Sequence, residues 1–146
     1  MTKLIITTLS LLLVVLFYSS CKTTKYTPTD FPDAQITFGS GGGFSGLVTD
    51  YTLLENGQLF KRSSKDKLFV PIKGVKKDAV AQAFKNFNFL GLDKMEVNDP
   101  GNLYYFIEFK TEEGTAKKLT WGNSKSEMEH TLKLFYSQLS SLIAKE

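Results

Sequence analysis

The stretch Leu103–Lys110, LYYFIEFK, gives the clearest secondary-structure signal in the chain. The character of the side chains differs between odd and even positions along it. This period of two predicts a β-strand with two distinct faces. The residues of one face are Leu103, Tyr105, Ile107 and Phe109. The residues of the other are Tyr104, Phe106, Glu108 and Lys110. This second face is either partly covered or a binding surface, with Tyr104 and Phe106 as candidate partner contacts.

Turn-forming residues divide the neighbouring sequence into further strands. The segment 112–115, EEGT, predicts a turn that returns the chain as a strand over 116–121. Three more strands are predicted upstream, at 35–38, 47–54 and 58–62. Asn56-Gly57 lies between the last two and is the preferred pair for a two-residue hairpin turn. The segment 68–72 predicts only a short extended piece, because Pro71 interrupts it.

Two segments show helical spacing instead. The first begins near Asp78, a helix-capping residue type, and ends at Gly91, a candidate carboxyl cap. Its apolar stripe is Val80, Ala83, Phe84 and Phe87. The second begins at two capping-box pairs, Ser124 with Glu127 and Ser126 with Glu129. Its stripe, over a helix of about 20 residues, is Met128, Leu132, Phe135, Leu139 and Leu142. Both stripes predict core packing, and a ligand cavity lined by the rings of the first is the alternative.

These segments together predict an α+β fold. We expect an antiparallel sheet of four to five strands, containing two hairpins, with two helices packed on one face. The expected order along the chain is β-β-β-α-β-β-α.

The segment 39–46, GSGGGFSG, separates the first two predicted strands. Glycine tolerates backbone angles that other residues avoid, so the segment predicts a tight or bulged turn. A phosphate-binding loop would open into a helix and carry Lys followed by Ser or Thr, and this segment has neither. The alternative to a structural turn is a contact loop, because Phe44 could enter a pocket of a partner.

The amino-terminal segment predicts where the protein resides. Lys3 precedes an apolar run at 4–17, and the small residues Ser19 and Ser20 follow. This order is typical of a secretory signal peptide, and the run is shorter than the roughly 20 residues that cross a bilayer. Cys21 is the only cysteine, so no disulfide is expected and the fold must rely on packing.

The four residues at 18–21, YSSC, resemble a bacterial lipobox. In such signals the cysteine thiol receives a diacylglycerol group and the chain is cleaved before it. The resemblance implies lipidation of Cys21, which would give a durable membrane anchor. An uncleaved signal anchor and ordinary secretion are the alternatives. In several Bacteroidota-type lipoproteins, acidic residues soon after the cysteine resemble a surface-export tag. No acidic residues closely follow Cys21, so this resemblance implies an outer-membrane lipoprotein that faces the periplasm.

The predicted domains follow from this interpretation. Residues 1–20 are the signal peptide to be removed, 21–33 carry the lipidated cysteine and a flexible tether, and 34–146 form one domain. The net charge of +3 falls to +2 without Lys3, a surplus too slight to predict a nucleic-acid partner or an anionic membrane surface. The lysines within 73–77 and at 117–118 are interpreted as solvated surface residues.

The chain offers few residues for catalysis. His130 is the only histidine and lies off the apolar stripe, so a Ser-His-Asp relay or a His-rich metal site has little to build on. Glu112 and Glu113 fall in a predicted turn and are interpreted as solvated charges. We therefore predict no enzymatic activity, no metal and no cofactor.

Several motifs carry a resemblance over about 100 residues. They are FGSGGGFSG at 38–46, YTLLENGQLF at 51–60, FKNFNFLGL at 84–92, NLYYFIEF at 102–109 and KKLTWG at 117–122. Together they resemble a group of small, uncharacterised bacterial envelope lipoproteins of the Bacteroidota type. More distantly, the layout is similar to emfourin-type inhibitors of bacterial metalloproteases, which also combine a glycine-containing hairpin, a small sheet and helices.

The predicted function is that of a non-enzymatic, membrane-anchored envelope lipoprotein that binds a protein partner. Its membrane contact is the lipid on Cys21, and its candidate partner contacts are Phe44, Tyr104 and Phe106. The alternative, which the second resemblance supports, is a periplasmic protease inhibitor that uses the loop 39–46.

Overall fold

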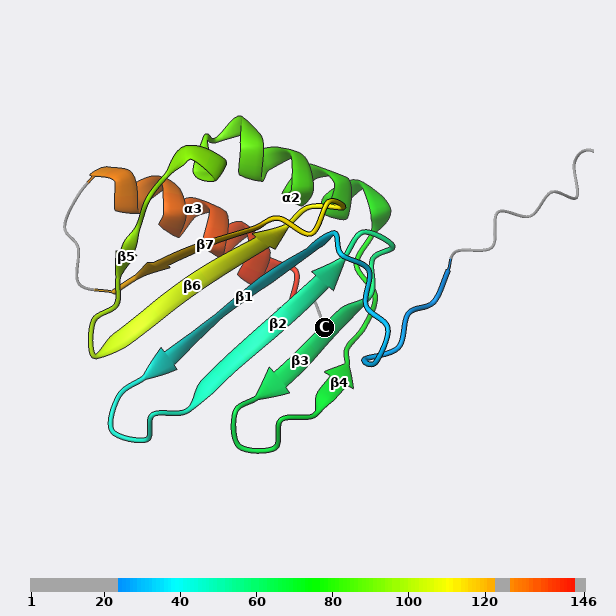
Figure 1. Ribbon diagram of the computed structural model, residues 1–146, viewed down its shortest axis with the longest axis horizontal. Helices are drawn as coiled ribbons and strands as arrows, with labels where there is room; N and C mark the ends of the chain where they lie inside the picture. Colours follow the sequence, from blue (N-terminus) through cyan, green and yellow to red (C-terminus); the bar gives the residue numbers. More distant parts are fainter. Residues whose placement is uncertain (1–23, 123–126, 144–146) are drawn as a thin grey trace, which may run out of the picture.

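The computed structural model describes residues 24–122 and 127–143. Within them, seven strands form one sheet in the order β4-β3-β2-β1-β6-β7-β5 (Figure 1). The strands are β1 (Gln35–Gly42), β2 (Val48–Leu54), β3 (Leu59–Ser63), β4 (Phe69–Pro71), β5 (Asn98–Asp99), β6 (Leu103–Lys110) and β7 (Ala116–Trp121). Neighbouring strands are antiparallel except β5 and β7, which are parallel, so the sheet is mixed.

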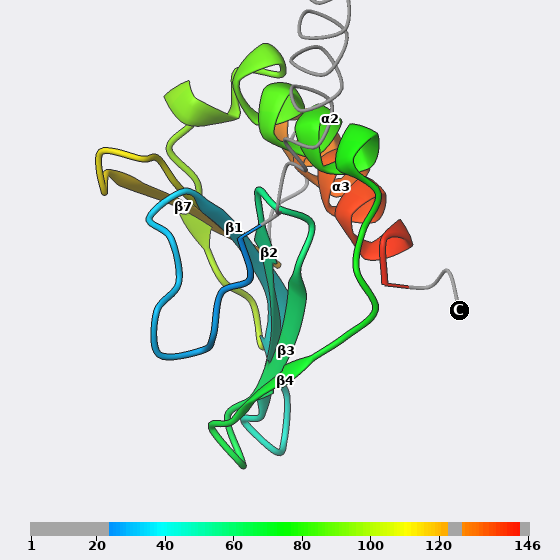
Figure 2. The ribbon, with the colours of Figure 1, turned by 90° about the vertical axis from the view of Figure 1, so that its right-hand side faces the viewer.

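Two helices, α2 (Lys77–Phe89) and α3 (Glu127–Ser141), cover one face of this sheet (Figure 2). A short 3-10 helix, η1 (Leu92–Lys94), follows α2. The core lies between the helices and the sheet, where Phe87 stacks on Phe109 with ring centroids 4.4 Å apart. The largest fully buried side chains include Trp121, Phe38, Phe87, Phe135, Ile36, Leu53, Ile107 and Leu132. Burial of these apolar side chains is the main stabilising contribution to the fold.

The α+β class and the two helices are confirmed, but the prediction of four to five antiparallel strands is wrong. The observed order is four strands, a helix, three strands and a helix. The predicted sheet left out two strands: β4, of 3 residues, lies within the extended piece expected at 68–72, and β5, of 2 residues, was not expected. Segments this short cannot display an alternating pattern. Pro71 is accommodated because β4 lies at the edge of the sheet. An edge strand has a neighbour on one side only, so the N–H that proline lacks is not needed for a hydrogen bond on the other side.

The register confirms the predicted faces of β6. Ile107 pairs with Phe38 and Phe109 pairs with Ile36, and all four side chains are buried in the core under the helices. Tyr104 and Phe106 therefore lie on the face away from the helices, beside the glycines of β1.

The glycine-rich segment is only partly a turn. Strand β1 continues through Gly42, and the connection to β2 is confined to 43–47. A Cβ on Gly39 would lie 2.3 Å from the Thr49 carbonyl oxygen, and one on Gly41 would lie 2.8 Å from the Tyr104 hydroxyl oxygen. The prediction of a turn over the whole segment is therefore wrong for its first half, because close packing within the sheet requires glycine there.

The turn between β2 and β3 also differs from the prediction. Leu54 N–H donates to the Gln58 carbonyl at 2.9 Å, and Gly57 N–H donates to the Leu54 carbonyl at 3.0 Å. The loop therefore has three residues instead of two. Gly57 takes a φ of 91°, as a three-residue hairpin loop requires at its last position.

The helix ends follow the prediction in part. Lys76 occupies the N-cap of α2 with no side-chain cap, so Asp78 lies in the first turn and the predicted cap is wrong. Gly91 has a φ of 69° directly after the C-cap residue Leu90, as expected of a carboxyl-terminal glycine. In the stripe of α3, Leu132, Phe135 and Leu139 are buried as predicted. The predicted caps Ser124 and Ser126, and the side chain of Met128, lie outside the described residues.

The described part of the predicted tether packs against the sheet. Residues 24–34 cross the face opposite the helices (Figure 2). Phe31 contacts Phe60 and Phe69, with ring centroids 4.8 and 5.0 Å apart. We call residues 24–34 the strap. Its packing fixes where the chain leaves the domain, while the division into signal peptide, tether and domain stays a prediction.

Substitution of Gly39 tests the close packing of β1. Gly39→Ala should lower the free energy of unfolding by about 1–3 kcal/mol, because the new Cβ meets the backbone of Thr49 and Asp50. Gly74→Ala is the matched control, since its Cβ would lie 3.6 Å from the nearest atom, the Gly57 carbonyl oxygen. Urea unfolding of both variants measures the difference, and equal midpoints would contradict the packing role.

Candidate functional site

The connection between β1 and β2 presents an exposed aromatic ring on a fixed base. Gly43 N–H donates to the Asn102 carbonyl at 2.7 Å, and Gly46 N–H donates to the Gly43 carbonyl at 3.2 Å. These bonds hold the loop against the start of β6. Phe44 stands between them and is fully exposed at 111%. The loop therefore presents the ring to solvent while its own backbone is tied down.

Other apolar side chains adjoin this loop. Leu103 lies beside Gly43, because a Cβ on Gly43 would be 3.0 Å from its Cδ2. Leu47, Leu103 and Tyr105 line a common surface hollow and are exposed at 47%, 64% and 43%. We call Phe44, Leu47, Leu103 and Tyr105 the loop-end patch. Clustered exposure of large apolar side chains is the usual signature of an interaction surface.

An aromatic cleft continues from the loop-end patch toward α3. Tyr105, Trp121 and Tyr136 contact one another, with ring centroids 5.2–5.9 Å apart. They line a cleft of about 410 Å³ together with Lys133, Ser137 and Ser140. Trp121 Nε1 has no hydrogen-bond partner among the described residues. The cleft is large enough for a partner side chain and offers rings against which it could pack.

Burial raises the pKa of Tyr136 above the ordinary value of 10.0, although side-chain hydrogen bonds with Ser40 and Ser140 act in the opposite direction. The charge of Tyr105, when ionised, would raise it further. The Tyr136 hydroxyl therefore remains protonated at neutral pH and can donate a hydrogen bond.

The three predicted contact residues take different positions. Phe44 is exposed, as a contact residue must be. Tyr104 is half-buried and its ring lies against Gly41. Phe106 is only 6% exposed, with the Lys118 ammonium 4.9 Å from its ring centroid. Their role in binding stays a prediction, and exposure favours Phe44 among them.

Sequence reasoning missed most of the surface around Phe44. Leu103 and Tyr105 share the face of β6 that carries Ile107 and Phe109, as predicted, but they lie at the start of the strand and are exposed there. The only sequence signal for the exposure of these two side chains was their place at the start of the strand, next to a turn. Trp121 and Tyr136 come from β7 and α3, so spacing along the chain could not group them with Tyr105.

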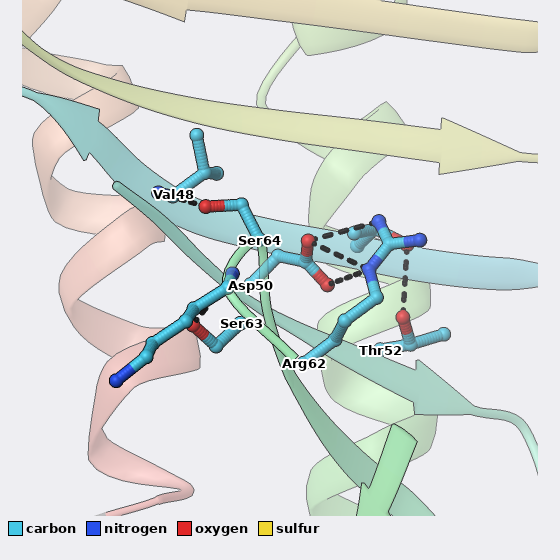
Figure 3. A network of polar contacts seen from close by, with 8 residues as sticks. Val48, Asp50, Thr52, Arg62, Ser63 and Ser64 are labelled. Atoms are coloured by element: carbon cyan, nitrogen blue, oxygen red, sulfur yellow. Dashed lines mark hydrogen bonds and ion pairs between the residues drawn. The ribbon is translucent and has the colours of Figure 1, made fainter. Parts of the chain in front are cut away.

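A polar site lies on the face of the sheet opposite the helices (Figure 3). Arg62 binds the Asp50 carboxylate through Nε at 3.1 Å and Nη2 at 2.9 Å. The Arg62 guanidinium also lies 4.8 Å from the Phe69 ring centroid. Nearby, the hydroxyls of Thr37 and Thr52 share a hydrogen bond of 3.3 Å. Asp50 is 4% exposed, so this pair satisfies a buried charge.

The described residues provide few side chains suited to catalysis, either at the loop-end patch or at the Asp50–Arg62 pair. His130 is exposed on α3, and Glu112 and Glu113 are exposed beside the β6–β7 turn. Residues 24–122 and 127–143 contain no group of three His, Cys, Asp or Glu side chains able to hold a metal ion. The same residues contain no helix long and apolar enough to span a bilayer. Cys21, the predicted lipid site, lies outside them.

The predicted basic clusters differ in their surroundings. Lys117 forms an ion pair with Glu96, and Lys118 covers the Phe106 ring. Lys73, Lys76 and Lys77 are exposed beside the start of α2.

Comparison with known proteins adds no assignment. No protein-family model matches this chain, and no curated protein matches its sequence. The resemblances to envelope lipoproteins and to protease inhibitors therefore stay predictions.

The Asp50–Arg62 pair can be tested against a neighbouring lysine. Arg62→Ala should lower the free energy of unfolding by about 1–3 kcal/mol, because it leaves the Asp50 carboxylate buried without its cation. Lys61→Ala, the adjacent exposed cation on β3, should cost much less. Urea unfolding of both variants, of Asp50→Ala and of the double variant Asp50→Ala with Arg62→Ala measures the coupling. Additive effects of the two changes would show that the pair does not act as a unit.

Proposed function

We propose that this chain is a non-enzymatic, lipid-anchored envelope protein that binds a protein partner. The single observation that carries the proposal is the loop-end patch, in which Phe44 and three neighbouring apolar side chains are exposed together. Solvent exposure of these groups is unfavourable in the isolated protein, and burial against a partner would remove that cost.

The shape of the surface supports binding to a folded protein. Phe44 projects from a loop with a hydrogen-bonded base, so little conformational entropy is lost when the ring enters a pocket. The aromatic cleft beside it could receive a side chain from the partner in return. The rings of Tyr105 and Tyr136, whose centroids lie 5.2 Å apart, line the cleft and provide surfaces on which that side chain could pack.

The membrane anchor and the absence of catalysis are parts of the same proposal. The apolar leader and Cys21 support lipidation, and the thin inventory of histidine and cysteine supports a binding role. We place the protein at the periplasmic side of the outer membrane because no acidic residues closely follow Cys21.

Capture from detergent-solubilised envelopes tests the proposal. The wild-type protein should retain a stoichiometric partner, and the mass of the purified chain should show lipid on Cys21. Phe44→Ala should weaken capture by about 30-fold or more, as expected for a central aromatic contact. Phe89→Ala is the matched control, because Phe89 is also highly exposed but lies at the end of α2.

Two results would argue against this function. Equal capture by the two alanine variants would remove the loop-end patch from the binding surface. A mature chain with unmodified Cys21 would remove the anchor, whatever the partner.

A second candidate function is inhibition of a periplasmic protease. The observation that favours it is again Phe44. Its exposed ring stands on a loop held by backbone hydrogen bonds, and it resembles a side chain that enters the specificity pocket of a protease. In that case the soluble part of an extracellular or periplasmic protease would be the partner.

Assays of metalloproteases with and without the protein distinguish the second candidate from the first. If the chain is an inhibitor, Phe44→Ala should raise the inhibition constant by about 30-fold or more, while Phe89→Ala leaves it unchanged. Absence of inhibition across the panel would eliminate this candidate and leave partner binding in place.

A further inference from the structure

The loop-end patch and the aromatic cleft are parts of one surface, because Tyr105 belongs to both. Its ring lines one hollow with Leu47 and Leu103, and it lines the cleft with Trp121 and Tyr136. The β1–β2 connection and the start of β6 lie side by side at the left of Figure 1. A partner that covers the patch therefore also meets the cleft.

This surface carries a projecting aromatic ring. Phe44 is exposed at 111%, so its ring does not occupy the cleft of its own molecule. The glycines on either side of it fix the loop, because Gly43 N–H donates to the Asn102 carbonyl and Gly46 N–H donates to the Gly43 carbonyl. The ring is therefore held in solvent, where it can enter a hollow of another molecule.

The aromatic cleft suits such a ring in size and in chemistry. Its volume is about 410 Å³, whereas a cavity of about 150 Å³ is enough to hold a benzene ring. Three of its lining side chains, Tyr105, Trp121 and Tyr136, are aromatic. Aromatic rings pack favourably against one another edge to face or offset. A phenylalanine from another molecule is thus an occupant that matches the cleft.

A surface that bears both a projecting ring and a matching cleft is complementary to itself. Rotation by 180° about an axis midway between Phe44 and the cleft exchanges the two features. The Phe44 ring of each copy then meets the cleft of the other, and both contacts form in one closed dimer. Tyr105 lies nearest to this axis, because it belongs to the patch and to the cleft.

The charge of the surface does not oppose contact between two copies. The segments 39–49 and 100–107, which supply the loop and the start of β6, contain no charged residue. Charged side chains occur only around them, namely Lys133 at the cleft, Asp99 before the start of β6 and the segment 65–67, Lys-Asp-Lys, on the neighbouring β3–β4 connection. An uncharged centre with both signs of charge at its border is typical of a protein–protein interface.

We propose that the partner of the loop-end patch is a second copy of this chain, and that Phe44 of each copy enters the aromatic cleft of the other. This inference rests on the proposed function, because it names the occupant of the same binding surface. Pairing removes about 1,000 Å² of surface from water, near the lower limit for a specific interface. The proposed lipid anchor confines the copies to one bilayer, which raises their effective concentration and favours a dimer of modest affinity.

Sedimentation of the full chain, purified from envelopes in detergent, measures the number of copies in each particle. The wild type should pass from one copy to two as its concentration rises. Phe44→Ala removes both projecting rings of a dimer, so the dissociation constant should rise by about 100-fold or more. Phe89→Ala is the control, because it removes an equally large exposed ring at the end of α2 and should leave the constant unchanged.

A second variant closes the cleft instead of removing the ring. Ser137→Trp places an indole over the cleft from an exposed position on α3 and should weaken the dimer by a similar factor. Ser141→Trp is its matched control, because Ser141 is exposed on the same helix but does not line the cleft. Thermal unfolding confirms that each variant is folded.

An equal mixture of Phe44→Ala and Ser137→Trp tests the exchange of rings directly. In a mixed dimer, the Phe44 ring of the tryptophan variant meets the open cleft of the alanine variant, so one of the two contacts is restored. The dissociation constant of the mixed dimer should therefore lie near the geometric mean of the values for the wild type and for either variant alone.

The outcomes separate this inference from the proposed function. A full chain that stays monomeric at every concentration overturns the pairing, and the proposed function stands if capture through Phe44 recovers a different protein. A mixture that associates no better than either variant alone overturns the exchange of rings. If Phe44→Ala changes neither self-association nor capture, the loop-end patch is not a binding surface and both proposals fall.

Discussion

The pairing of β1 along both of its edges is the constraint on which the rest of the structure depends. Strand β1 pairs with β2, its immediate successor, and with β6, which follows much later in the chain. This second pairing joins the two groups of strands into one sheet. Only a sheet of that width offers a face to α2 and α3 together, and the buried side chains between them stabilise the whole domain.

Glycine in β1 allows the other face to be filled without a helix. Gly39 leaves room for the backbone of β2 at Asp50, whose carboxylate is bound by Arg62. Gly41 leaves room for the ring of Tyr104. On the same face, the strap adds Phe31 to a small aromatic cluster. This face is thus closed by side chains of the sheet itself and by the strap, and the loop-end patch stays exposed at the end of the strands.

The two ends of the central strands differ in chemistry, which gives the proposed function a direction. One end carries the loop-end patch and the aromatic cleft, where the rings of Phe44 and Tyr105 are exposed. At the other end, the β2–β3 turn holds the first residues of the strap, because Asn56 Nδ2 donates to the Thr24 carbonyl.

The sequence by itself determined the α+β class, the two faces of β6, the buried stripe of α3 and the carboxyl-terminal glycine of α2, because each depends on residues a few positions apart. It indicated β4 only as an extended piece, and it did not reveal β5, which is too short for a pattern, or the strand glycines, which local rules assign to turns. Of the candidate site, only Phe44 could be named in advance. Tertiary structure alone brought Tyr105, Trp121 and Tyr136 together and placed Leu103 beside the β1–β2 connection, because these groups meet through long-range pairing that no local spacing records.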